Sequence, residues 1–384
     1  MLNIVELLAH AARHPRAILP GAPRGIINDA SAWVHACRAK TPADLRRGPA
    51  AAIYPFAEQS LLNLTPARDA RNGNWIALDR VMPVPAANLY FLRGARVIGN
   101  EGAVISSDNR VFSEFTYVDD AGGIHSHAIF RRRRFPRAAP LRGWYATLCY
   151  PSAAAYFHWL VECLPRLALL EKYLDSIDGF IVPANIESGL KQSLAAFGID
   201  ENRLVYQDVG SQYAPEHLLV PAYCAGRNIP PWVSAFLRNR VLKDRPSAAR
   251  QRIYVSRADA GKRRIVNENA LLPILARHHI KVIRPSELSF IAQAECFDDA
   301  DFVIGPHGAG LTNALFCRSG SKILELLPSP SVKPGTFHSV SSAAGADYWC
   351  MHGERSDASN MPDVHADFFI EPTNFDHALQ RVLG

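Results

Sequence analysis

The chain has 384 residues, of which 48% are hydrophobic and 20% are charged. This length exceeds what one hydrophobic core normally organises, so we expect two domains, or one large domain with an appendage. No apolar run approaches the roughly 20 residues of a transmembrane helix, and the seven scattered cysteines contain no CxxC pair. The composition argues against a membrane-spanning protein, a disulfide scaffold and a cysteine-based zinc site.

The net charge of +6 fits an anionic ligand, a polyanionic product or an acidic membrane surface, but most basic residues are dispersed. The one dense run, Arg131 to Arg134, lacks the interleaved aromatic residues of a nucleic-acid groove, so we expect a solvated edge and no nucleic-acid partner. Residues 1–19 resemble an amphipathic helix more than a secretory signal. A cytoplasmic location is expected, with possible peripheral contact at the inner face of the membrane.

In chain order, residues 1–75 show little periodicity, and residues 80–150 hold short strand-like runs between Gly and Asp turns. We therefore expect residues 1–150 to form an N-terminal extension with short strands. From about residue 153 helical and strand patterns alternate, beginning with YFHWLVECLPRLALLEKYL and GFIVP. This alternation predicts parallel βα units, and hence a first α/β domain over residues 151–245.

The alternation restarts after the polar, turn-rich stretch DRPSAARQ with RIYVSR, a helix, IKVIRP, a second helix, DFVIG and KILELLP. It predicts a second α/β domain over residues 246–370. Residues 371–384 contain a closing helical pattern that we expect to pack back on the first domain.

Residues 302–316, FVIGPHGAGLTNALF, read as a buried strand that ends in a turn almost without side chains. Ligands of open α/β sheets lie at the carboxyl ends of strands, where a Gly-rich turn lets backbone N–H groups approach a phosphate at a helix N-terminus. His307, Gly308, Ala309 and Gly310 occupy such a turn. The pattern predicts phosphate binding, although such glycines can also serve only the backbone conformation.

Two neighbouring features strengthen this prediction. Glu325 follows a strand segment in KILELLP, and a carboxylate at a strand end could accept hydrogen bonds from ribose hydroxyls, the alternative being a surface or salt-bridged acid. Arg257 leaves the strand RIYVS, and Lys262, Arg263 and Arg264 follow it. Cations at this position can converge on a diphosphate, but for Arg263 a solvated position is expected.

The helical pattern YFHWLVECLPRL places His158, Glu162 and Arg166 on one face, opposite an apolar side. A polar stripe on an otherwise buried helix needs a cavity, and a His and a carboxylate one turn apart could deprotonate a substrate hydroxyl. The alternative is a satisfied His–Glu pair at a domain interface. Pro165 removes one helix hydrogen bond, so a kink is expected there.

Together, the motifs YFHWLVECLPRL, IYVSRADAGKRRIVNE, IGPHGAGLTNALFC and ILELLP resemble glycosyltransferase family 61, of the bacterial capsular polysaccharide biosynthesis type. The resemblance extends over about residues 150–330. It implies two Rossmann-like domains that face each other across a cleft (GT-B type), and inverting transfer from a nucleotide sugar without an essential metal. Glu162 falls on the family's acidic position, Arg257 and Arg264 on its S-R and R-R-x-x-N-E pattern, and residues 307–310 on its H-G-A-G loop.

The expected function is transfer of a sugar from a nucleotide sugar to a glycan or glycolipid in surface polysaccharide biosynthesis. The ribose would lie on Glu325, the diphosphate between the turn after His307 and the cations, and Glu162 or His158 would be the base. The nucleotide sugar is a substrate, so no cofactor is expected, and the N-terminal extension would belong to the acceptor side. The alternatives are a polysaccharide pyruvyl transferase-like enzyme that uses phosphoenolpyruvate and a non-catalytic nucleotide- or glycan-binding protein.

Overall fold

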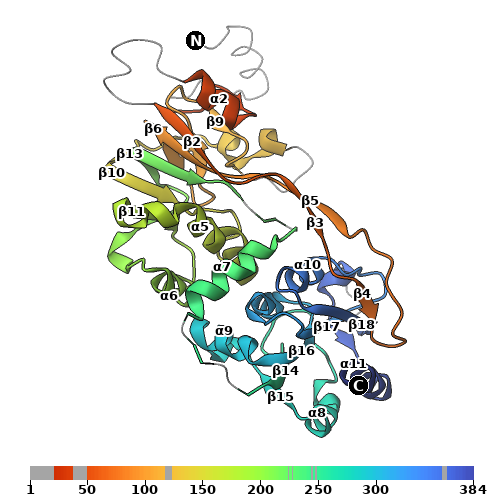
Figure 1. The fold of residues 1–384 in the computed structure, drawn as a ribbon. Coiled ribbons are helices and arrows are strands. Elements are labelled where there is room, and N and C mark those ends of the chain that lie inside the picture. Colours follow the sequence, from red (N-terminus) through yellow and green to blue (C-terminus); the bar gives the residue numbers. More distant parts are fainter. Residues whose placement is uncertain are drawn as a thin grey trace. The chain divides into compact units, whose positions relative to one another are not determined.

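The computed structural model of the protein divides into two compact units, each containing helices and parallel strands (Figure 1). Unit 1 comprises Met1–Gln59 and Pro85–Cys224, and unit 2 comprises Ser60–Val84 and Ala225–Gly384. This content confirms the predicted α/β fold class. The residues that the structure describes are 21–37, 50–116, 123–223, 225–226, 228–243, 245–246, 249–356 and 361–384.

The core of unit 1 is a mixed sheet formed by ten of the described strands. They are β1 (Ile26–Ile27), β2 (Ala51–Ala57), β6 (Ala87–Arg93), β7 (Arg96–Ile98), β8 (Ala103–Ile105), β9 (Val111–Phe112), β10 (Ala139–Thr147), β11 (Gly179–Pro183), β12 (Leu204–Gln207) and β13 (Gln212–Pro221). Four run parallel in the order β12-β11-β10-β13, which is 3-2-1-4 along the chain, as in half of a Rossmann sheet. Because β6 and β7 pair antiparallel with β13, strands of the predicted N-terminal extension continue this sheet.

The helical segment after β10 is interrupted around Pro165, where a kink was expected, and it is more irregular than a single kinked helix. It consists of α4 (Tyr156–His158), the π-helical turn η4 (Trp159–Cys163), the 3₁₀ turn η5 (Leu164–Arg166), α5 (Leu167–Leu170) and the 3₁₀ turn η6 (Glu171–Ser176). The cause is local, because Pro165 has no N–H to donate and the turn before it is widened, with the Leu164 N–H bonded to the Trp159 carbonyl. The spacing of His158 and Glu162 is therefore not that of a regular α-helix. The other helical elements of unit 1 are α2 (Ala30–Ala36), η2 (Gly123–Ser126), η3 (Ala128–Arg131), α6 (Ser188–Ser193), η7 (Leu194–Phe197) and η8 (Glu201–Arg203).

Unit 2 contains a parallel sheet of six described strands in the order β15-β14-β16-β17-β18-β4. Its strands are β4 (Ala67–Asp69), β14 (Gln251–Val255), β15 (Ile280–Ile283), β16 (Ala300–Pro306), β17 (Lys322–Leu327) and β18 (Asp347–His352). Without β4, the order along the chain is 2-1-3-4-5, that of a doubly wound, flavodoxin-like sheet. The order reverses between β14 and β16, so their carboxyl ends form the topological switch point, where ligands of such sheets bind.

Helices cover the unit 2 sheet and explain why its strands read as continuous apolar runs. They are α7 (Pro231–Val241), α8 (Glu268–Arg277), α9 (Phe290–Asp298), α10 (Thr336–Ala343) and α11 (Pro372–Leu383), with the 3₁₀ elements η9 (Pro285–Glu287), η10 (Ala309–Phe316) and η11 (Asp363–His365). α8 and α11 pack against one another and against the same face of the sheet, through Leu271, Leu275, Phe375 and Leu379 (Figure 1). The closing helix, which was expected to return to the first domain, thus has its apolar side chains in the core of unit 2.

Residues 60–84 also belong to unit 2, although the sequence analysis assigned them to the N-terminal extension. β4 adds a sixth strand beside β18, and β3 (Ser60–Asn63) and β5 (Val81–Val84) form an antiparallel ribbon. A further two-stranded ribbon joins β19 (Glu354–Arg355) and β20 (Phe368–Phe369). β4 has only three residues, Ala-Arg-Asp, so no alternation of apolar residues marks it in the sequence.

Candidate active site

The predicted phosphate-binding turn lies at the switch point of the unit 2 sheet. β14 and β16 are hydrogen-bonded neighbours, with Tyr254 opposite Ile304. Arg257 follows the end of β14, and His307 and Gly308 follow the end of β16. The structure therefore brings together the two motifs that the sequence analysis expected at strand ends.

Close packing favours glycine at two positions of this turn. A Cβ atom on Gly308 would lie 2.2 Å from Nη1 of Arg257, and one on Gly310 would lie 2.9 Å from Cγ1 of Val255. The backbone of Gly308 is extended, with a φ of 171°, and any residue can adopt that conformation. Glycine is therefore favoured at this position because there is little room for a side chain. The small side chains thus allow the end of β14, and the Arg257 guanidinium with it, to lie directly against the turn.

Arg257 and Arg263 form a pair of cations whose hydrogen-bonding capacity is incompletely used. Arg257 Nη2 donates to the Lys262 carbonyl over 3.1 Å, and within the described ranges the Nε atoms of both arginines are buried without a hydrogen-bond partner. Burial lowers the pKa of Arg257, and burial together with the nearby Arg257 charge lowers the pKa of Arg263 to about 10. Carboxylates of Asp259, Asp367 and Glu325 act on these cations only at longer range. Such a pair is suited to bind an anion.

Arg264, which was expected at the diphosphate, is already engaged. Its Nη2 and Nε atoms lie 2.7 and 2.9 Å from Oδ2 of Asp367, and its backbone N–H donates to Oδ1 of the same carboxylate. Arg263, which was expected to be solvated, is half-buried with a φ of 60°, a conformation uncommon for a residue with a side chain. The cations that remain available are therefore Arg257 and Arg263, with the exposed Lys262 nearby.

Glu325 is buried and holds His307, whereas the sequence analysis expected it at a ribose. Its side chain is 1% exposed, one oxygen lies 2.5 Å from His307 Nδ1, and the other accepts a hydrogen bond from the Tyr348 hydroxyl. Burial and the Glu325 charge raise the pKa of Tyr348 well above its usual value. Because an ionised carboxylate only accepts hydrogen bonds, this geometry places the His307 proton on Nδ1 and leaves Nε2 for a ligand.

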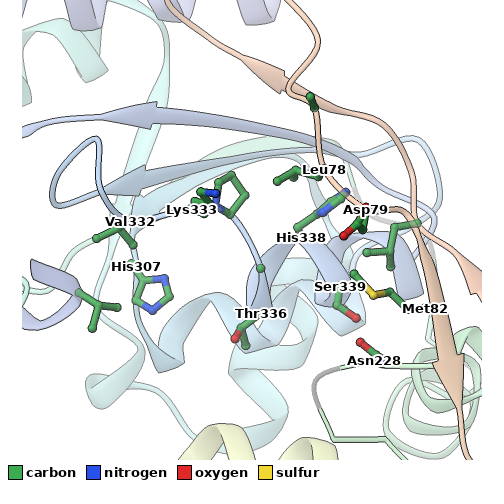
Figure 2. Close-up of a pocket in the computed structure, with 15 residues that line it drawn as sticks. Leu78, Asp79, Met82, Asn228, His307, Val332, Lys333, Thr336, His338 and Ser339 are labelled. Atoms are coloured by element: carbon green, nitrogen blue, oxygen red, sulfur yellow. The ribbon is translucent and has the colours of Figure 1, made fainter.

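A pocket of about 840 Å³ opens beside His307 within unit 2 (Figure 2). Residues 332–335 and the first turn of α10 form part of its lining, and Asn228 and residues from the segment 60–84 complete much of the rest. The N-cap residue of α10, Gly335, provides no side-chain cap, so the first N–H groups of this helix are not satisfied by a capping side chain. The turn predicted to bind phosphate includes His307, and His307 also lines the pocket.

The candidate residues of unit 1 also lie near the carboxyl ends of parallel strands. Glu162 is 3% exposed, in the π-helical turn that follows β10. Arg166, the third residue of the predicted polar stripe, is buried and donates hydrogen bonds to the carbonyls of Cys149 and Pro221. These two bonds connect the carboxyl ends of β10 and β13. Burial raises the pKa of Tyr223, and the Glu162 charge contributes to this shift. Glu162 thus lies in a desolvated setting in the segment that follows the carboxyl end of β10.

Within the described residues, no group of three or more His, Cys, Asp or Glu side chains is arranged to hold a metal ion. No described helix is long and apolar enough to span a bilayer.

Residues 156–324 match the model of the family Glycosyltransferase 61. The matched span begins at α4 and ends one residue before Glu325, and it includes Glu162, Arg257 and His307. It supports the family that the four motifs resemble. No curated protein shows significant sequence similarity to the chain.

Proposed function

We propose that this protein is a glycosyltransferase that transfers a sugar from a nucleotide sugar to a glycan or glycolipid acceptor. The observation that carries this proposal is the pair Arg257 and Arg263, two guanidiniums with buried, unpartnered Nε atoms, of which that of Arg257 lies against Gly308. A partly buried guanidinium with an unsatisfied Nε–H and no ion pair is costly, and a diphosphate would supply both the charge and the acceptor oxygens that it lacks. The match to the Glycosyltransferase 61 model supports the same activity.

In the proposed complex the diphosphate lies against the turn 307–310, between its backbone N–H groups and the two arginines. As the bond between the anomeric carbon and the phosphate oxygen breaks, the electron pair goes to the diphosphate. The arginines and the amides stabilise that developing charge without reorganisation, which is why we propose that transfer does not depend on a metal.

We assign His307 to the phosphate and Glu325 to a positioning role. The Glu325 carboxylate fixes the His307 ring through Nδ1 and directs Nε2 away from itself. A protonated Nε2 would donate to a phosphate oxygen of the leaving group. This role replaces the ribose contact expected from the sequence, because both Glu325 oxygens are bonded and its side chain is 1% exposed.

For the acceptor we retain Glu162 or His158 as the base. The acceptor hydroxyl would pass its proton to this base while its oxygen attacks the anomeric carbon and inverts it. The presence of two α/β units, each with a set of adjacent parallel strands and a switch point, supports a GT-B organisation. Glu162→Gln should abolish most transfer and leave nucleotide affinity nearly unchanged, and full transfer by this variant would assign the base elsewhere.

We further propose a role in surface polysaccharide biosynthesis at the inner face of the membrane. The side chains of Arg131, Arg133 and Arg134 are exposed, and clustered cations of this kind attract anionic headgroups. Replacing all three by Ala should reduce sedimentation of the protein with vesicles rich in anionic lipid, and equal sedimentation would remove the membrane from the proposal.

A matched pair of arginine variants tests the donor site. UDP, GDP and phosphoenolpyruvate are titrated calorimetrically into the wild type, Arg263→Ala and Arg264→Ala. We expect a nucleoside diphosphate to bind the wild type, the loss of Arg263 to weaken it about tenfold or more, and the loss of Arg264 to change it little. Equal effects of the two substitutions would contradict the assignment of Arg263. Tighter binding of phosphoenolpyruvate than of either diphosphate would favour a pyruvyl transferase.

A further inference from the structure

The segment 60–84 is a fixed part of unit 2. β4 pairs with β18, and the Ala70 N–H donates to the Cys350 carbonyl over 2.9 Å. On the other side of the segment, the Thr65 N–H donates to Ser342 Oγ over 2.9 Å. The Thr65 carbonyl lies 2.6 Å from Nε2 of His338. Because Ser342 and His338 belong to α10, these bonds hold the segment in register with the helix whose first turn lines the pocket.

The same segment forms one wall of the pocket. It contributes Leu64, Ala77, Leu78, Asp79 and Met82 to the lining. In Figure 2, Leu78, Asp79 and Met82 lie on one side, and His307 and Val332 lie on the opposite side. Residues 64–82 of this wall are therefore far in sequence from the turn 307–310, but they line the same cavity as His307.

Asp79 is the available carboxylate of this cavity. Its side chain is exposed, and among the residues that the structure describes it has no hydrogen-bond or ion-pair partner. Asn228, whose amide donates to the Pro83 carbonyl over 2.9 Å, and Thr336 add further polar groups at the same cavity. A carboxylate only accepts hydrogen bonds, so Asp79 requires a ligand with hydroxyl or N–H donors.

The chemistry of the cavity distinguishes the two halves of a nucleotide sugar. None of the described lining residues is a Phe, Tyr or Trp on which a nucleobase could stack, whereas carboxylate, amide, hydroxyl and ammonium groups are all present. Such groups match the hydroxyls of a sugar, and a site that hydrogen-bonds a hydroxyl discriminates strongly against ligands that lack it. The volume of about 840 Å³ is within the range of small-molecule sites.

We infer that the segment 60–84 forms the sugar-selecting wall of the donor site, with Asp79 accepting hydrogen bonds from hydroxyls of the transferred sugar. This inference rests on the proposed function, because it takes the diphosphate to lie at the shared residue His307. It gives a stretch of the N-terminal extension a role in donor choice.

The test compares nucleotide sugars with their parent diphosphates. UDP, GDP and their conjugates with glucose, galactose, N-acetylglucosamine, xylose, mannose and fucose are titrated into the wild type, Asp79→Ala and Asp301→Ala. Asp301 is a matched control, exposed at the amino end of β16. We expect Asp79→Ala to weaken the preferred conjugate about tenfold or more and its parent diphosphate less than about twofold, with Asp301→Ala unchanged.

A second variant fills the cavity without removing a polar group. Ala77→Trp should exclude the sugar conjugate and retain the diphosphate, because Ala77 is exposed on the same wall. Nucleotide binding by the wild type with no selective loss in Asp79→Ala would overturn this inference alone. A wild type that binds neither diphosphate nor any conjugate would overturn the proposed function, and this inference with it.

Discussion

Unit 2 carries two clusters of arginines at opposite ends of the same sheet, and they differ in how their charges are balanced. Before the amino end of β16, Arg238, Arg245 and Arg318 each lie 2.8 Å from an oxygen of Asp298, whose side chain is 6% exposed. At the carboxyl end, Arg257 and Arg263 make no ion pair with any described carboxylate. The first cluster is complete as it stands, and the second lacks an anion.

Whether its charge is balanced by a carboxylate distinguishes a structural arginine from a candidate ligand-binding arginine better than its positive charge alone. In the complete cluster burial alone would raise the pKa of Asp298, but hydrogen bonds from Arg318 and Arg238 hold it well below its usual range. In the incomplete cluster burial lowers the pKa of Arg257, which means that the protein disfavours the charge that it places there. A cost of this kind is expected where a ligand supplies the missing partner.

The largest expected effect is on stability, at the complete cluster. Asp298→Ala should lower the free energy of unfolding by about 3–5 kcal/mol, because it removes the buried carboxylate that three partly buried guanidiniums share. Denaturant unfolding measures the change, with Asp301→Ala as an exposed control expected within about 0.5 kcal/mol. If the free energy of unfolding falls little in both variants, the Asp298 cluster does not stabilise the fold. The contrast between the two arginine clusters would then be wrong.

At the incomplete cluster the same kind of deletion should affect binding. Arg257→Ala should weaken UDP or GDP about 10- to 100-fold, since it removes charge-assisted hydrogen bonds to the diphosphate. Its unfolding free energy should stay the same or rise, because an unpaired, desolvated charge is removed. Calorimetry and denaturant unfolding of the same preparation check both statements. If Arg257→Ala is destabilised but binds the diphosphate with unchanged affinity, Arg257 stabilises the fold and does not bind the ligand.

A methyl group at the turn should have a smaller effect. Gly308→Ala puts its Cβ where the Arg257 guanidinium lies, so that side chain must move, while the extended backbone accepts Ala. We expect nucleoside diphosphate affinity to fall about tenfold with the fold retained. Gly261→Ala is the control, because a Cβ there would meet nothing within 4 Å. Equal affinity in the two variants would mean that the position of Arg257 is unimportant.

The smallest effect is the acid dependence of the complete cluster. The folded pKa of Asp298 lies below its unfolded value, so its contribution to stability is present above pH 4 and is lost as pH falls toward the folded pKa. Between pH 5 and pH 3 the wild type should lose about 1 kcal/mol more than Asp298→Asn, in which this group does not titrate. Urea unfolding at the two pH values measures the difference, and identical losses would assign the acid sensitivity to other carboxylates.

The sequence identified the ends of the strands well. Apolar runs followed by Arg257 and by His307–Gly308 are local patterns, and in a parallel sheet adjacent strands bring such ends together. The α/β class follows from the same alternation.

Other features depend on contacts that no local pattern records. Arg263 and Arg264 are adjacent and chemically alike, and only the positive φ of Arg263 and the position of Asp367 separate their roles. Glu325 was expected at a strand end but lies among His307 and Tyr348, because its side chain points into the covered face of the sheet. β4 adds to the sheet through three residues with no apolar periodicity, so the wall formed by the segment 60–84 left no signal.

The most direct test of this account is a crystal structure of the protein with UDP or GDP bound. It should show the diphosphate at the switch point, with its oxygens within hydrogen-bond distance of the guanidiniums of Arg257 and Arg263 and of the backbone at Gly308. A diphosphate bound elsewhere, with both guanidiniums still lacking an anion, would contradict the central claim.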